Sequence, residues 1–229
     1  MCNDHDMMRT IVNHLLGVPF EYESHIENIF HLIEKNLSSY HPSSLLDVGC
    51  GDGKRTIRLA QYFNIGMDHV YGLDAYDLFT GSSQNYFTVS QIDLEINPLP
   101  YQDDMFDLVI CNQVLEHLKN YDNVLYQMIR VTKAGGYILI GIPNLAHLIN
   151  RIYLLLGIQP MCISLDSRQH VRGFTHKAFL AKIHSLPKIH YMDCAGSAII
   201  YPLPILLAKY LSRFFVGICG YVCYLMRKE

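Results

Sequence analysis

Leu45-Leu46-Asp47-Val48-Gly49-Cys50-Gly51-Asp52-Gly53 is the stretch that decides the fold of this chain. An apolar run leads directly into three glycines at alternate positions. Because glycine has no Cβ, such a turn lets a ligand approach the bare backbone. Residues 54–60, which follow the turn, have the pattern of a helix. A strand, a glycine turn and a helix in this order predict a nucleotide-type site at the carboxyl end of a parallel strand.

The glycine turn does not have the pattern of a phosphate cradle. The dinucleotide fingerprint G-x-G-x-x-G requires a glycine where the chain has Lys54. The phosphate loop G-x-x-x-x-G-K-[ST] requires a glycine and a Ser or Thr where Val48 and Arg55 stand. Asp47 and Asp52 also lie in the turn, and carboxylates repel phosphates. The turn therefore favours a ligand that carries a positive charge and hydroxyl groups.

The glycine turn resembles motif I of the class I S-adenosylmethionine-dependent methyltransferases, and further segments extend the resemblance over residues 40–145. These segments follow in order and at suitable spacing, at 70–74, 92–94, 106–118 and 133–144. The resemblance implies an α/β fold with a Rossmann-like, seven-stranded, mostly parallel sheet, an antiparallel last strand, and helices on both faces. The alternation of apolar strands with helices independently indicates a parallel sheet that is covered on both faces.

The resemblance also implies the cofactor S-adenosyl-L-methionine and the residues that contact it. Asp74 ends the second strand segment, where the acidic residue of the family accepts hydrogen bonds from the two ribose hydroxyls. Asp93 stands where a family carboxylate accepts a hydrogen bond from the adenine amino group. The expected cofactor-binding residues are Asp47, Gly49, Cys50, Gly51, Gly53, Asp74, Ala75, Asp93, Leu94 and Asn112.

The activity implied by the resemblance is methyl transfer to a small molecule or to a saccharide- or lipid-linked acceptor, at oxygen. A hydroxyl acceptor benefits from a general base, and histidine is the usual choice. His117 follows the fourth strand segment. His170 begins a segment that resembles the H-x-R-x-[FY]-[ST] pattern of many bacterial small-molecule and saccharide-associated methyltransferases. We expect these two histidines to be catalytic, and we expect Arg172 and His147 to bind the substrate.

No metal site is expected from the sequence. Glu116 and His117 are neighbours after the fourth strand segment, where a partly buried polar pair on a helix is the expected arrangement. A metal role would need further histidine or carboxylate ligands, and none lies at close helical spacing.

Composition and charge limit the classes of binding partner and the cellular compartment that we expect for this chain. The formal net charge is −3, so the chain lacks the basic footprint of a nucleic-acid-binding protein. Residues 112–115 also lack an Asn-Pro-Pro-Tyr-type base-methylation motif. The 7 cysteines include no C-x-x-C pair, which indicates free thiols in a reducing compartment. Charged residues interrupt any N-terminal signal peptide, so we expect a cytoplasmic protein. A protein substrate, and a non-catalytic relative that only binds a ligand or partner, remain open.

We expect a single domain over residues 1–229 with four parts. Residues 1–40 have the pattern of helices that cap the cofactor, and 41–145 form the cofactor-binding core. Residues 146–187 stand where the family inserts substrate-recognition elements. Residues 188–229 should supply the C-terminal strands and a helix.

The C-terminal part is almost continuously apolar from 199 to 226, which suggests either a membrane segment or buried strands. Its uncharged run, 214–226, is shorter than the roughly 20 residues that a spanning helix needs. The resemblance implies a sixth strand at 189–194, a helix at 203–213, and a last strand at 215–226 inserted between the fifth and sixth. Lys209 and Arg213 form a basic stripe on that helix. Peripheral contact of 203–213 with the inner face of the membrane, or with a lipid-bearing substrate, therefore stays open.

Overall fold

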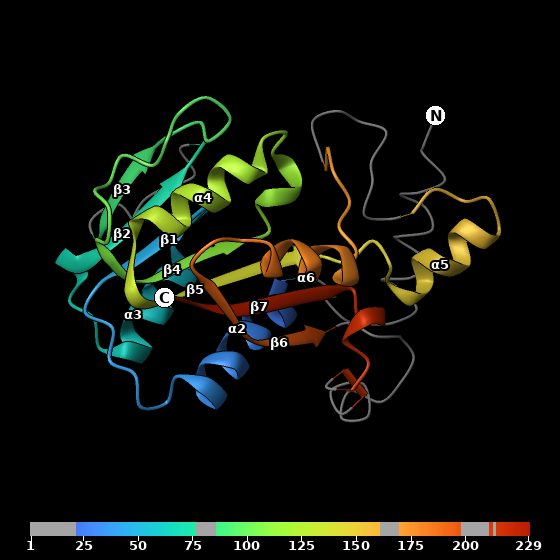
Figure 1. The fold of residues 1–229 in the computed structure, drawn as a ribbon, viewed down its shortest axis with the longest axis horizontal. Helices are drawn as coiled ribbons and strands as arrows, with labels where there is room; N and C mark the ends of the chain where they lie inside the picture. Colours follow the sequence, from blue (N-terminus) through green and yellow to red (C-terminus); the bar gives the residue numbers. More distant parts are fainter. Residues whose placement is uncertain (1–21, 77–85, 161–169, 198–210, 213) are drawn as a thin grey trace.

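The computed structural model describes residues 22–76, 86–160, 170–197, 211–212 and 214–229. Within these residues, seven strands form one sheet in the order β3-β2-β1-β4-β5-β7-β6. All neighbouring strands from β3 to β5 are parallel, and β7 is antiparallel to both β5 and β6. This topology confirms the predicted Rossmann-like sheet and the insertion of the last strand between the fifth and sixth (Figure 1). The strands are β1 (Leu45–Val48), β2 (Val70–Asp74), β3 (Thr88–Gln91), β4 (Phe106–Asn112), β5 (Thr132–Pro143), β6 (Ile189–Ser197) and β7 (Tyr221–Lys228).

Helices cover both faces of the sheet, as expected for a parallel sheet with apolar strands. One face packs against α4 (Tyr121–Val131) and α6 (His176–His184). The other packs against α2 (Tyr22–Asn36) and α3 (Lys54–Phe63). Leu45 and Leu46 point into opposite cores, because successive side chains of a strand alternate between faces. The remaining helical segments are α5 (Leu148–Leu155) and the 3₁₀ turns η1 (Met67–His69), η3 (Leu115–His117) and η4 (Val216–Ile218).

The described part of the expected N-terminal cap is α2, which covers one face of the sheet. Ile29, Leu32 and Ile33 of α2 are buried in the core on that face. The helix is tied to β6 by the Asn36 amide, which donates to Asp193 Oδ2 at 2.9 Å, and by Asn28, which donates to Ser197 Oγ at 2.9 Å. Residues 1–21 lie outside the described residues, so the cap over the cofactor stays a prediction.

The C-terminal strands differ in extent from the prediction. The last strand was expected from residue 215 but starts at Tyr221, because η4 and a turn precede it. The side chain of Asn144 holds this turn by donating to Gly217 O at 3.1 Å and to Cys219 O at 2.8 Å. The sixth strand runs three residues further than predicted, to Ser197. Of the helix expected at 203–213, nearly all lies outside the described residues. No helix within the described residues is long and apolar enough to cross a membrane.

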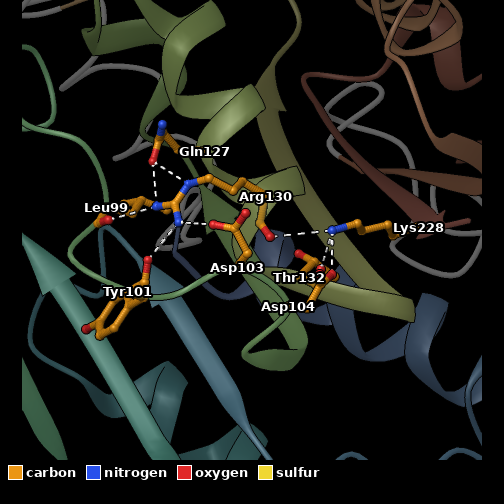
Figure 2. Close-up of polar contacts among 8 residues, drawn as sticks. All are labelled: Leu99, Tyr101, Asp103, Asp104, Gln127, Arg130, Thr132 and Lys228. Carbon is orange, nitrogen blue, oxygen red and sulfur yellow. Dashed lines mark hydrogen bonds and ion pairs between the residues drawn. The ribbon is translucent and has the colours of Figure 1, made fainter.

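Two cationic side chains connect the loop before β4 to α4, β5 and β7 (Figure 2). The Arg130 guanidinium donates to the carbonyls of Leu99 and Tyr101, at 3.0 and 2.8 Å, and also contacts Asp103 and Gln127. The Lys228 ammonium donates to Thr132 O and Asp104 Oδ1, both at 2.7 Å. Because its side chain is only 9% exposed, Lys228 pairs with a carbonyl that water does not reach easily.

Replacing Lys228 with methionine is expected to lower the free energy of unfolding by about 1–3 kcal/mol, the cost of leaving a buried acceptor unpaired. Methionine keeps the apolar stem of the lysine but cannot donate to the Thr132 carbonyl. Lys35 is the matched control, because it pairs with Asp193 while its own side chain is 58% exposed. Lys35→Met should cost less than about 1 kcal/mol. Urea denaturation measures both values, and equal losses would contradict the role assigned to Lys228.

Candidate functional site

The glycine turn after β1 is fastened to the end of β2. Gly49, Gly51 and Gly53 have φ angles of 77°, 57° and 76°, in the left-handed region that favours glycine. The backbone N–H groups of Gly49 and Cys50 both donate to Leu73 O, at 2.7 and 2.9 Å. These bonds hold the turn at the carboxyl edge of the sheet, where α/β proteins of this topology bind their ligands.

Gly49 and Gly51 need to be glycine for different reasons. A Cβ added to Gly49 would lie 2.1 Å from Val114 Cγ2, because the segment after β4 packs directly against the turn. A Cβ added to Gly51 would meet nothing within 4 Å. The protein's own packing therefore excludes a side chain at Gly49, whereas at Gly51 it leaves room for another molecule to approach the backbone.

Asp74 lies beside the turn at the end of β2. Its Oδ2 accepts a hydrogen bond from Gly51 N at 2.9 Å, and its Oδ1 accepts one from Tyr76 N at 3.1 Å. A carboxylate offers about four lone-pair sites, so two remain for a ligand. The side chain is partly exposed. The structure thus brings together Asp74 and the glycine turn, which the sequence predicts to bind the same cofactor.

The Asp47 side chain, which the sequence predicts to contact the cofactor, has its partners within the protein. Its side chain is fully buried, with 0% exposure. Thr56 Oγ1 donates to Asp47 Oδ2 at 2.7 Å, and Arg55 Nη2 donates to Asp47 Oδ1 at 2.8 Å. The same guanidinium donates to Gly49 O at 3.1 Å. Asp47 therefore fixes α3 and the turn to each other, and its contact with the cofactor stays a prediction. The sequence signal for this role is the Arg-Thr pair in the first turn of the helix.

Three more of the expected cofactor-binding side chains are buried: Cys50, Leu94 and Asn112. The Cys50 sulfur packs against Gly72, where an added Cβ would lie 2.7 Å from it, and burial raises the pKa of this thiol. The Asn112 amide packs against Gly141 in the same way. These side chains shape the edge of the sheet from within, and contact of these three residues with the cofactor stays a prediction.

Asp93 and Ala75 lie exposed near the glycine turn, after β3 and β2. Asp93 Oδ1 accepts a hydrogen bond from Glu95 N at 2.9 Å, which orients the carboxylate within its loop. The Ala75 carbonyl accepts a hydrogen bond from Gln91 Nε2 at 3.1 Å. Both residues are exposed at this edge, and their contact with the cofactor stays a prediction.

A second group of polar side chains gathers after β4. His117 lies in η3, and its ring centroid is 4.8 Å from that of His170. The segment that carries His170 is held there by the backbone, since Val171 N and Arg172 N donate to Glu116 O at 3.0 and 3.2 Å. The structure therefore brings the two expected catalytic histidines together, although they are far apart in the sequence.

Glu116 completes this group. We expected a partly buried residue on a helix, but η3 is a single 3₁₀ turn and the Glu116 side chain is 0% exposed. Burial raises the pKa of its carboxyl group to about 8. His170 Nε2 lies 3.9 Å from Glu116 Oε1, which is too long for a hydrogen bond. Spacing along the sequence does not indicate this arrangement, because His170 comes from a segment that is distant from Glu116 and His117 in the chain.

The two expected substrate-binding residues have partners within the protein. Arg172 Nη2 donates to Lys119 O at 2.7 Å, and its guanidinium carbon lies 4.7 Å from the centre of the Tyr121 ring. His147 is 5% exposed and precedes the first turn of α5, where its carbonyl accepts from Arg151 N at 3.1 Å. Arg172 is partly accessible, and substrate binding by Arg172 and His147 stays a prediction.

The chain is similar to known methyltransferases in sequence and in fold. Residues 46–140 match a protein family described as "Methyltransferase domain". The chain is 32% identical over 125 residues to the ubiquinone biosynthesis O-methyltransferase of Rickettsia prowazekii, an alignment that covers 52% of this chain and 47% of that protein. It is 27% identical over 103 residues to the ajmaline N-methyltransferase of Rauvolfia serpentina, covering 43% of this chain and 35% of that protein. The chain thus spans about half or less of the curated relatives it matches.

A solved structure from Thermotoga maritima has the same fold over nearly the whole length. It is described as an S-adenosylmethionine-dependent methyltransferase and possible histamine N-methyltransferase. The superposition has a TM-score of 0.63 with 16% identity and covers 98% of this chain and 96% of that chain. The present chain therefore shares its fold with that structure.

Proposed function

We propose that this chain, whose residues 46–140 match a family described as a methyltransferase domain, binds S-adenosylmethionine at the carboxyl edge of its sheet and transfers the methyl group to a small molecule. The observation that carries the proposal is the contact between Asp74 and the glycine turn. A carboxylate with spare lone pairs stands next to a backbone position, Gly51, that has open space where a side chain would be. This combination suits a ligand that brings hydroxyl groups and a positive charge close to the main chain.

The chain's own residues have three tasks in this reaction. Asp74 accepts hydrogen bonds from the ribose hydroxyls, and exposed Asp93 contacts the adenine amino group. Gly49, Gly51 and Gly53 let the rest of the cofactor lie against the turn. The bound cofactor supplies a methyl group already activated on a sulfonium, so the protein need only align the acceptor with the S–CH₃ bond and exclude water.

We propose that the acceptor reacts beside the group formed by Glu116, His117 and His170. Val114 packs on Gly49 and is followed within three residues by Glu116 and His117, which keeps this group close to the glycine turn. Partly accessible Arg172 could hold an anionic part of the acceptor. We propose oxygen as the acceptor atom, which the relative named as a ubiquinone biosynthesis O-methyltransferase supports. The relative named as an ajmaline N-methyltransferase makes nitrogen the alternative to test.

Calorimetric titration with S-adenosylmethionine and S-adenosylhomocysteine tests the cofactor. We expect micromolar binding of both, because the two share the adenosine that Asp74 and Asp93 would hold. Transfer of a labelled methyl group to panels of phenolic, saccharide and amine acceptors then tests the activity and the acceptor atom. Binding without transfer would favour a non-catalytic protein that uses the same site. A folded protein that binds neither compound would overturn the proposed function.

A further inference from the structure

The Glu116 carboxylate is in an unfavourable electrostatic position. Its side chain is fully buried, and neither carboxylate oxygen has a hydrogen-bond partner among the residues that the structure describes. Burying a polar group without a partner is costly, and burying a charge costs considerably more. Arg172, the nearest cationic residue along the segment bound to Glu116, directs its Nη2 to the Lys119 carbonyl and stacks on Tyr121. The carboxylate therefore lacks a strong partner for its oxygens.

Two imidazole rings lie next to this carboxylate. One nitrogen of His117, one nitrogen of His170 and one oxygen of Glu116 all lie within 4.8 Å of one another. Metal bonds to histidine nitrogen and carboxylate oxygen are about 2.0–2.2 Å long, so the donor atoms around one ion lie roughly 3–4 Å apart. Small side-chain rotations would bring the three atoms to those separations. The backbone hydrogen bonds from Val171 N and Arg172 N to Glu116 O hold the segment that carries His170 beside Glu116.

We propose that Glu116, His117 and His170 bind a divalent first-row transition-metal ion. Two imidazole nitrogens and one carboxylate oxygen form a ligand set that suits zinc, iron, cobalt or manganese, whereas magnesium and calcium are bound by oxygen ligands. Three protein ligands leave at least one coordination position open. His117 is exposed and the His170 side chain is 28% exposed, so an ion can enter from solvent.

The position of the ion also has a consequence that rests on the proposed function. The three ligands lie after β4, and Val114 of the same segment contacts the glycine turn. An acceptor with an oxygen donor could occupy the open coordination position and be oriented by it. Bound to the ion, His117 and His170 would act as ligands and could not at the same time accept the acceptor's proton.

Cobalt is a suitable probe, because its visible absorption reports the ligands directly. The untagged full chain, stripped with a chelator, is titrated with Co²⁺ and then with Zn²⁺ in a calorimeter, without cofactor or acceptor. We expect about one ion per chain and visible cobalt bands without a sulfur-to-cobalt charge-transfer band, since a bound cysteine would produce one. Mg²⁺ should not compete. The result of the metal titration does not depend on whether the protein binds S-adenosylmethionine. It can therefore be distinguished from the test of the proposed function.

Variants of the ligands complete the test. Glu116→Gln and His117→Asn should each weaken Co²⁺ binding at least about tenfold, or ~1.4 kcal/mol. His190→Asn is the matched control, because His190 is an exposed histidine on β6. Glu116→Gln keeps the size of the side chain and removes only the ionisable carboxyl group, so it should not lower the melting temperature of the metal-free protein. Exposed His117 can be changed without disturbing the core. Absence of binding in the wild type, unchanged binding in both variants, or equal binding of Mg²⁺ would each overturn the proposal.

Discussion

Replacing Asp74 with alanine is expected to weaken S-adenosylmethionine binding by about 1.5–3 kcal/mol, the range for hydrogen bonds to a charged group. This corresponds to a dissociation constant raised roughly 10- to 150-fold. The loss has two physical sources. In the proposed complex the ribose hydroxyls would lose a charged acceptor, and Gly51 N loses the bond to Asp74 Oδ2 that orients the turn. Calorimetry on the folded variant measures the change in affinity.

Two further variants separate these sources. Asp74→Asn keeps a carbonyl oxygen that can accept from Gly51 N but removes the charge, so its affinity should lie between the wild type and Asp74→Ala. Asp68→Ala is the matched control, because the Asp68 side chain is 78% exposed in η1, before the same strand. It should bind the cofactor like the wild type. An unchanged dissociation constant in Asp74→Ala would remove Asp74 from the site.

The sheet could be predicted because its signals are local. Strand β2 occupies the residues expected from the apolar run that ends at Asp74, and α3 starts directly after Gly53 as the glycine turn indicated. The last strand was less predictable because residues 214–226 are apolar throughout, and periodicity cannot locate a boundary inside such a run. What fixes its start is the Asn144 side chain, which binds the carbonyls of Gly217 and Cys219 from a distant part of the chain.

In the candidate site, the backbone positions could be predicted from the sequence more completely than the contacts of the side chains. The positions of the glycines and of Asp74 follow from the strand–turn–helix order, because carboxyl ends of parallel strands meet at one edge. The enclosure of Asp47 depends on Arg55 and Thr56 turning back from α3, and the grouping of Glu116 with His170 depends on backbone bonds between distant segments. Such contacts are set by tertiary packing, which spacing along the chain does not report.

Gly49→Ala is expected to destabilise the fold by several kcal/mol. The new Cβ would lie 2.1 Å from Val114 Cγ2, and Val114 is β-branched, so it cannot move aside by rotating a flexible end. Overpacking costs about 1–3 kcal/mol and a left-handed residue with a Cβ about 1–2 kcal/mol more. Because whole domains are stable by only about 5–15 kcal/mol, the urea midpoint should fall sharply. A midpoint close to that of the wild type would show that the turn and the segment after β4 are not packed as described.

Gly51→Ala should give the opposite pattern, with the fold retained and cofactor binding lost. Its Cβ meets no protein atom within 4 Å, so the stability cost is limited to the backbone conformation at a φ of 57°. Gly157→Ala controls for that cost, because Gly157 has a φ of 70°, equally open surroundings, and lies in the loop after α5. Both variants should lose about 1–2 kcal/mol of unfolding free energy. Only Gly51→Ala should lose affinity for S-adenosylmethionine, because the methyl group occupies space that the ligand needs. Equal affinity in the two variants would mean that the cofactor does not approach the backbone at Gly51.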